Sequence, residues 1–345
     1  MSHASHSPSA TPAPESTPES TTQIVAALSL KGGVGKTSVV LGVAGAAASA
    51  GLKVLVIDLD PQANATATLN PESAQFTTSD VLYDGRPGIA ADAIVPSAWE
   101  GTLDLIASEP ALEHRSQSPG AGSELRLRTT LDGVASNYDL VIFDCPPSLG
   151  ELTRNALYAA TSALVVTEPT FFAVQGAAQA IEAVQVVSEH GNPELKPAGI
   201  VVNRMRNTLE DHRERMADLQ KEFGELVLGG LPDRSAVPQA QGAQIPVQKW
   251  ESNGAADISK ALGLLLNRLV GKTVVNVTTT TVNLSDPTPA TTSATTTIRK
   301  KSKKNKTKKK KASTQEIAKT VDLTNKPESL ANLTPTYRFT TSEDK

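Results

Sequence analysis

The 345-residue sequence contains a single cysteine, Cys145, and no long uninterrupted run of apolar residues. One cysteine excludes an internal disulfide and any cluster held by several cysteines of one chain. A membrane-spanning helix needs roughly 18 consecutive apolar residues, so the sequence predicts no such helix. Residues 1–22 also have no basic start followed by an apolar run, which argues against a secretory signal. These absences favour a cytoplasmic protein.

The composition changes twice along the chain. Residues 1–22 are almost entirely small and polar, and residues 273–345 are rich in Thr, Pro and Lys, so we expect both segments to be disordered. Residues 23–272 alternate apolar runs with helical patterns and predict one α/β domain. Ten of the thirteen residues 299–311 are basic, which leaves about −13 for the rest of a chain whose net charge is −3. Affinity for nucleic acid must therefore come from a local patch or from this tail, whose candidate DNA-binding residues are Lys300, Lys301, Lys303 and Lys304.

The glycine-rich stretch 29–38 lies between an apolar run, residues 24–28, and a helical pattern of small residues. Glycines let the backbone turn inward so that its N–H groups can approach phosphate oxygens closely. The following helix N-terminus favours anions. In such a loop Lys36 reaches the β and γ phosphates and the Thr37 hydroxyl binds Mg²⁺. The predicted nucleotide-binding residues are Lys31, Gly32, Gly33, Val34, Gly35, Lys36, Thr37 and Ser38.

Three aspartates follow apolar runs that are typical of buried parallel strands. Asp58 and Asp60 come after residues 54–57, and Asp144 comes after residues 140–143. Ligands of open α/β sheets bind at the carboxyl ends of the strands, so we expect these carboxylates to share one metal–phosphate site. The sequence therefore predicts a doubly wound, mainly parallel sheet with helices on both faces. Cys145 is interpreted as a buried small residue and not as a nucleophile.

The motif K-G-G-x-G-K-T at residues 31–37 resembles the deviant Walker A signature of the ParA/MinD family of phosphate-loop ATPases. Residues 58–64, D-x-D-P-Q-x-N, and residues 144–148, D-C-P-P-S, are similar to further motifs of that family. The resemblance implies ATP and Mg²⁺ as cofactors, with Asp144 and Asp58 at the metal. It also implies that Asp60 activates the attacking water and that Lys31 crosses a dimer interface to the ATP of the partner subunit.

The resemblance covers roughly residues 23–272 and extends to the second half of the domain. It implies that Asn203 reads the adenine edge, although a structural turn asparagine is the competing interpretation. Pro232 is assigned to the nucleotide site and Arg234 to DNA contact. The implied function is DNA partitioning by an ATP-bound homodimer in the cytoplasm. The dimer would bind nucleoid DNA without sequence preference, and a ParB-type adaptor would stimulate hydrolysis.

Two other functions share the nucleotide motifs. A MinD-like ATPase that positions the division site would use a C-terminal amphipathic membrane helix, whereas the apolar spacing in residues 255–270 is more typical of core packing. A nucleotide-gated DNA scaffold would bind ATP with negligible turnover. Iron–sulfur reductase relatives are disfavoured because the cluster they hold needs more cysteines than this chain has.

Overall fold

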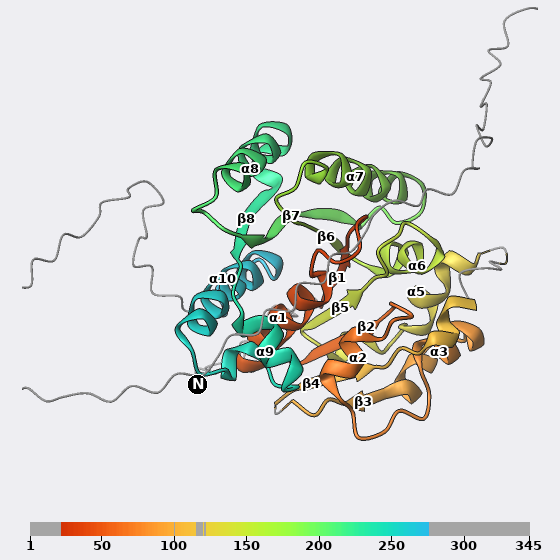
Figure 1. The fold of residues 1–345 in the computed structure, drawn as a ribbon. Coiled ribbons are helices and arrows are strands. Elements are labelled where there is room, and N and C mark those ends of the chain that lie inside the picture. The colour runs from red at the N-terminus through yellow and green to blue at the C-terminus, as the bar shows by residue number, and fades with distance from the viewer. Residues whose placement is uncertain (1–21, 100, 115–119, 121, 276–345) are drawn as a thin grey trace, which may run out of the picture. The chain divides into compact units, whose positions relative to one another are not determined.

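A single eight-stranded sheet forms the centre of the computed structural model, which describes residues 22–99, 101–114, 120 and 122–275 (Figure 1). The strand order is β3-β4-β2-β5-β1-β6-β7-β8, and all neighbours are parallel except β3 and β4. The strands are β1 (Gln23–Leu28), β2 (Val54–Asp58), β3 (Ile94–Pro96), β4 (Leu103–Ile106), β5 (Leu140–Asp144), β6 (Ser162–Thr167), β7 (Lys196–Met205) and β8 (Val227–Pro232).

Helices cover both faces of this sheet. Successive strand residues point to opposite faces, so Val25 and Ala27 of β1 join one buried hydrophobic cluster, whereas Ala26 and Leu28 join the other. The first cluster includes side chains from α1 (Lys36–Ser49), α2 (Asn64–Leu69), α9 (Ala236–Gly242) and α10 (Asn253–Leu269). The second includes side chains from α3 (Thr78–Asp84), α5 (Arg126–Thr130), α6 (Glu151–Ala159), α7 (Ala173–His190) and α8 (Glu210–Phe223). The prediction of a doubly wound α/β fold is confirmed.

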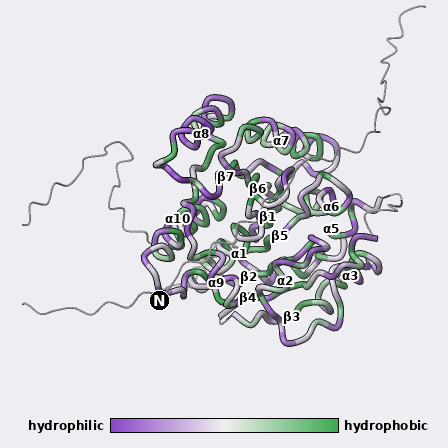
Figure 2. Tube along the Cα trace, viewed as in Figure 1, coloured by the Kyte–Doolittle hydropathy of each residue, from purple (hydrophilic) through white to green (hydrophobic). Residues whose placement is uncertain are grey.

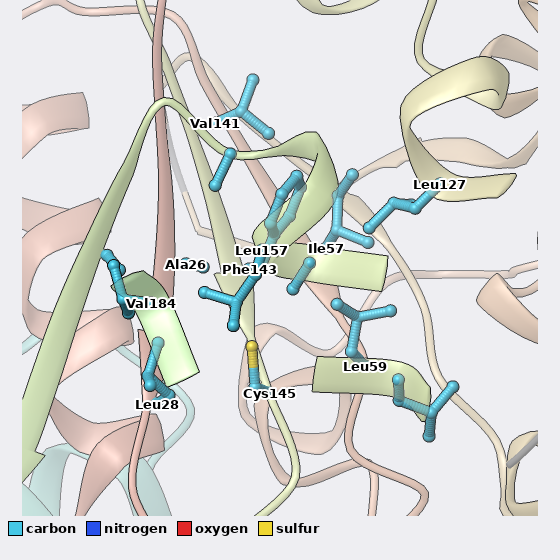
Figure 3. Close-up of a cluster of buried hydrophobic side chains, with 14 of the residues drawn as sticks. Ala26, Leu28, Ile57, Leu59, Leu127, Val141, Phe143, Cys145, Leu157 and Val184 are labelled. Carbon is cyan, nitrogen blue, oxygen red and sulfur yellow. The ribbon is translucent and has the colours of Figure 1, made fainter. Parts of the chain in front are cut away.

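Figure 3 shows part of the second cluster, in which Phe143 of β5 lies between strand and helix side chains. Burying the apolar strand residues on both faces supplies the main driving force for this fold, at roughly 25 cal/mol per Å² of apolar surface. Figure 2 shows that the central strands are mostly hydrophobic, whereas α8 is largely hydrophilic.

Helix α1 is buried around most of its circumference, because it packs between the sheet and α10. Gly42 permits this close packing: a Cβ at that position would lie 2.6 Å from Cδ1 of Leu262 on α10. The phosphate loop runs directly into the first residue of α1, so this packing also fixes the position of the loop.

Some local predictions were wrong in their bounds. The pattern in residues 123–134 predicts one helix, but the structure has a 3₁₀ turn, Ser123–Leu125, followed by the short α5. The pattern in residues 99–106 predicts one strand, but the chain bends at residues 101–102 and β4 begins only at Leu103. Helix α3 is capped by Thr77 together with Asp80, which exchange hydrogen bonds across the first turn.

Several predictions concern residues that the structure does not describe. Apart from Thr22 and residues 273–275, the two predicted tail segments lie outside the described residues, as do Lys300, Lys301, Lys303 and Lys304. The proposed boundaries at residues 22 and 272 therefore stay predictions. Within the described part of the chain, none of the helices combines the length and the hydrophobicity that crossing a membrane requires.

Candidate functional site

The loop between β1 and α1 forms one wall of a cavity of about 350 Å³ at the carboxyl edge of the sheet. Gly33 and Gly35 have φ values of +82° and +80°, a left-handed conformation that favours glycine. The volume lies within the range of roughly 300–1,000 Å³ that is usual for small-molecule sites. The cavity is lined by Ser29, Lys31, Gly32, Gly33, Val34, Gly35, Lys36, Thr37, Ser38, Asp60, Asn64, Ala67, Thr68, Pro147, Arg204 and Gln241.

Lys36 and Thr37 both contact Asp144 below this loop. The Lys36 ammonium forms an ion pair with Oδ1 of Asp144, and the Thr37 hydroxyl donates a hydrogen bond of 2.7 Å to Oδ2. The register of the sheet explains the meeting, because Ala27 of β1 and Asp58 of β2 both lie level with Asp144. The carboxylate thus emerges between the two strands that lead into the phosphate loop and the Asp58–Asp60 segment.

The ion pair between Lys36 and Asp144 is buried, with 6% of the Lys36 side chain and none of the Asp144 side chain exposed. Burial alone would lower the pKa of Lys36, but the adjacent Asp144 carboxylate outweighs that effect and raises it. Lys36 is therefore charged at neutral pH. Removing one partner of such a pair leaves an uncompensated buried charge, which typically costs about 3–5 kcal/mol.

Asp58 lies beside Asp144 but has its own partners. Its Oδ2 accepts hydrogen bonds of 2.8 Å from both the backbone N–H and the hydroxyl of Thr66, and its Oδ1 accepts one of 3.1 Å from the Asp60 N–H. Burial and the neighbouring Asp144 charge raise the pKa of Asp58 to about 7. Asp58 therefore holds the start of α2 in place and adds a second carboxyl group to the base of the site.

Asp60 lies in the cavity wall, unlike Asp58 and Asp144. Its Oδ1 accepts a hydrogen bond of 3.0 Å from the Gln62 N–H, and burial raises the pKa of Asp60. Its backbone carbonyl accepts a hydrogen bond of 2.8 Å from the Ser108 hydroxyl, which fixes the loop after β2. Of the three predicted aspartates, Asp60 is thus the one whose side chain can contact a molecule in the cavity.

Asn203 fastens the end of β7 to the phosphate loop. Its Nδ2 donates to the Val34 carbonyl at 2.9 Å and to the Gly35 carbonyl at 3.5 Å. This contact is the structural role that competes with adenine recognition, and the latter stays a prediction. Pro232 ends β8 next to Met205 of β7, at the same edge of the sheet. Its assignment to the nucleotide site also stays a prediction.

The polar side chains of the cavity wall that sequence reasoning missed include Arg204 and Gln241. Nη1 of Arg204 donates a hydrogen bond of 2.7 Å to the Gly33 carbonyl, and Oε1 of Gln241 accepts one of 3.1 Å from the Ser38 hydroxyl. The position of Arg204 directly after Asn203, at a strand end, could have indicated it. Gln241 comes from α9, far along the chain, and no sequence signal marks it.

Comparison with known proteins decides the family. A family model described as "AAA domain" matches residues 22–197. Cell division protein PomZ of Myxococcus xanthus (strain DK1622) is 35% identical over 255 residues, which cover 72% of this chain and 79% of PomZ. Chromosome partitioning protein ParA of Caulobacter vibrioides (strain NA1000 / CB15N) is 34% identical over 238 residues, 66% of this chain and 87% of that protein. The chain belongs to the ParA/MinD-type family of ATPases.

A solved structure is similar to this ParA/MinD-type ATPase along most of the domain. It is described as cobyrinic acid a,c-diamide synthase from Mycobacterium smegmatis with bound ADP and magnesium. The sequences are 28% identical, the TM-score is 0.60, and the match covers 73% of this chain and 98% of the other.

Arg234 of this ATPase contacts one acidic side chain and one backbone carbonyl. Its Nη2 lies 3.0 Å from Oδ2 of Asp257 on α10, and its Nη1 donates a hydrogen bond of 3.0 Å to the Asp233 carbonyl. Contact with a DNA phosphate would have to replace the pair with Asp257. The assignment of Arg234 to DNA therefore stays a prediction.

Cys145 follows Asp144 but points away from the cavity, into the hydrophobic cluster of Figure 3. The thiol is completely buried, and burial raises its pKa to about 12. A thiol in this state is not a nucleophile at neutral pH, in agreement with the sequence interpretation.

The geometry of the phosphate loop makes a prediction about Gly35. A Cβ at Gly35 would lie 2.3 Å from Nδ2 of Asn203, and the φ of +80° is strained for alanine. We expect Gly35→Ala to lower the free energy of unfolding of the nucleotide-free protein by about 1–3 kcal/mol in urea titrations followed by circular dichroism.

Gly32→Ala is the matched control, because a Cβ at Gly32 has no neighbour within 4 Å. Its free energy of unfolding should stay within about 0.5 kcal/mol of the wild type. Equal stability of the two variants would contradict the packing of Asn203 against the loop.

Proposed function

We propose that this chain is an ATP-dependent DNA-partitioning ATPase that uses Mg²⁺. The observation that carries the proposal is the convergence of Lys36 and Thr37 on Asp144 beneath a glycine-rich loop. The names of PomZ and ParA support a role in cell division or chromosome partitioning. The ADP and magnesium in the similar solved structure support the ligands.

The phosphates of ATP would bind the N–H groups of the loop, where the α1 N-terminus adds a favourable dipole. Lys36 would exchange its contact with Asp144 for one with the β and γ phosphates. A triphosphate carries more negative charge than one carboxylate, which favours this exchange. The Thr37 hydroxyl, once released from Asp144, would be available to bind the metal.

The residues present fit Mg²⁺. This ion prefers oxygen ligands and combines one or two carboxylates with phosphate oxygens and water. The Thr37 hydroxyl and the Asp144 carboxylate supply such oxygens at one point. The raised pKa of Asp58 reflects burial and repulsion by Asp144, which a divalent cation would offset. When bound, the metal neutralises charge that develops on the transferred phosphoryl group.

Asp60 would orient and activate the attacking water, because it is the aspartate in the cavity wall. Burial raises its pKa, which makes its carboxylate a better proton acceptor than an exposed aspartate. Lys31 would reach the ATP of a partner subunit in the homodimer. The dimer would bind nucleoid DNA, and a ParB-type adaptor would accelerate hydrolysis.

The MinD-like alternative finds no support in α10. Five of its six large apolar side chains are buried in the cluster shared with α1 and the sheet: Ile258, Leu262, Leu265, Leu266 and Leu269. Leu264, which is 47% exposed, is the sixth, and one exposed leucine does not make an apolar face for a membrane. The scaffold alternative differs from the proposed function in turnover, which the next experiment measures.

The substitution Asp60→Ala tests the catalytic assignment. We expect it to lower phosphate release, measured with ATP, Mg²⁺ and DNA, by about a hundredfold or more, because a positioned base typically contributes that factor. ATP binding should persist, so gel filtration should show a trapped ATP-bound dimer.

The exposed Asp92 supplies the control, since Asp92→Ala should leave turnover unchanged. Undiminished phosphate release by Asp60→Ala would remove Asp60 from the mechanism. Negligible turnover by the wild-type protein would instead favour the scaffold function.

DNA affinity is expected to depend on the basic segment 299–311. Each neutralised phosphate adds about 0.9 to the slope of log affinity against log salt concentration. Deletion of residues 299–345 should therefore weaken DNA binding and flatten this slope in anisotropy titrations. Arg234→Ala should lower the slope by about 0.9 if Arg234 leaves Asp257 for a phosphate. Identical salt titrations would show that neither group contributes.

A further inference from the structure

Glu168 lies between the phosphate loop and the end of β7 because of the strand register. Leu28 of β1 is level with Val165 of β6, so the third residue after each, Lys31 and Glu168, meet beyond the strand ends. On the other side Thr167 is level with Val202 of β7, which brings Glu168 close to Arg204. The site residues identified from sequence motifs do not include Glu168.

The Glu168 carboxylate holds both neighbouring cations. Nζ of Lys31 lies 2.7 Å from Oε1, and Nη1 of Arg204 lies 3.7 Å from Oε2. The same Nη1 donates a hydrogen bond to the Gly33 carbonyl. Only 18% of the Glu168 side chain is exposed, against 56% for Lys31 and 51% for Arg204. One mostly buried carboxylate therefore serves as the counter-ion of two exposed cations.

The backbone at Glu168 is itself fixed. The N–H of Thr170 donates a hydrogen bond of 2.7 Å to the Glu168 carbonyl, and the N–H of Ala173, the first residue of α7, donates one of 3.0 Å to the Thr170 carbonyl. These two hydrogen bonds fix the conformation of the turn that joins β6 to α7. Lys31 and Arg204 are long, flexible side chains, so in any exchange of partners the cations move and the carboxylate stays.

Lys31 and Arg204 both line the phosphate cavity, whereas Glu168 does not. We propose that Glu168 is a positioning residue that holds Lys31 and Arg204 away from an incoming triphosphate in the nucleotide-free protein. Binding of ATP then requires both cations to leave Glu168: Arg204 turns to the phosphates in its own cavity, and Lys31 is released for the ATP of the partner subunit in the proposed homodimer. This inference rests on the proposed ATP-binding function of the same cavity.

Because Glu168 and the nucleotide phosphates compete for Lys31 and Arg204, Glu168 should affect the binding of nucleotides with different phosphate charge to different extents. A triphosphate attracts the two cations more strongly than a diphosphate does, so it gains more when Glu168 no longer competes. Neutralising Glu168 should therefore strengthen ATP binding more than ADP binding. If the role of Glu168 were purely structural, its neutralisation would instead weaken the binding of both ATP and ADP or lower the melting temperature of the protein.

The test compares Mg²⁺-ATP and Mg²⁺-ADP affinities of the full-length wild type and Glu168→Gln by isothermal titration calorimetry. We expect Glu168→Gln to bind ATP about three- to tenfold more tightly, because each partly exposed ion pair contributes modestly. The affinity for ADP should change by less than the affinity for ATP. Glu168→Asp, which keeps the charge, should behave as the wild type. If Glu168→Gln folds poorly, Glu168→Ala takes its place and should show the same stronger ATP binding.

A double-mutant cycle separates partner exchange from plain repulsion. In a Lys31→Ala background the effect of Glu168→Gln should shrink, since only Arg204 is left to release. An equal effect in both backgrounds would mean that Glu168 merely repels the phosphates, and it would overturn the proposal. Unchanged or weaker ATP binding by a folded Glu168→Gln would overturn it as well. Absence of ATP binding by the wild type would overturn the proposed function instead.

Discussion

The buried ion pair between Lys36 and Asp144 is the interaction on which the account of this site depends. Both groups are removed from water, so each charge is tolerable only because the other lies beside it. The pair exists because the phosphate loop and β5 end at the same edge of a parallel sheet. It therefore links the fold to the site, because the core packing that fixes α1 and β5 also places the Lys36 ammonium where phosphates would bind.

Two further acidic groups give this arrangement its character. Asp58 crowds Asp144 from the neighbouring strand, and Glu168 neutralises Lys31 and Arg204 at the cavity rim. In the nucleotide-free protein every basic side chain named at the site thus has an acidic partner. A bound nucleotide would have to redistribute these pairs, so binding and reorganisation of charge become one event. This coupling is the physical basis that we propose for a nucleotide-driven cycle.

The residues at the centre of the site could be predicted from the sequence, whereas those at the rim of the cavity could not. Lys36, Thr37 and Asp144 could be predicted because each belongs to a local motif at a strand end, and parallel strands bring such ends together. Thr66, which binds Asp58, escaped notice because hydrogen-bond partners of a buried carboxylate carry no spacing signal. Glu168 and Arg204 depend on the registers of β1, β6 and β7, which are set by tertiary packing. Residues of the tail lie outside the described structure and add nothing to this comparison.

The decisive measurement is the position of Nζ of Lys36 in a crystal structure with Mg²⁺ and a non-hydrolysable ATP analogue. We expect this nitrogen to have left Asp144 and to contact the β and γ phosphates, with the Thr37 hydroxyl turned toward the metal. An analogue bound elsewhere, or a cavity still closed by the pair of Lys36 and Asp144, would contradict it.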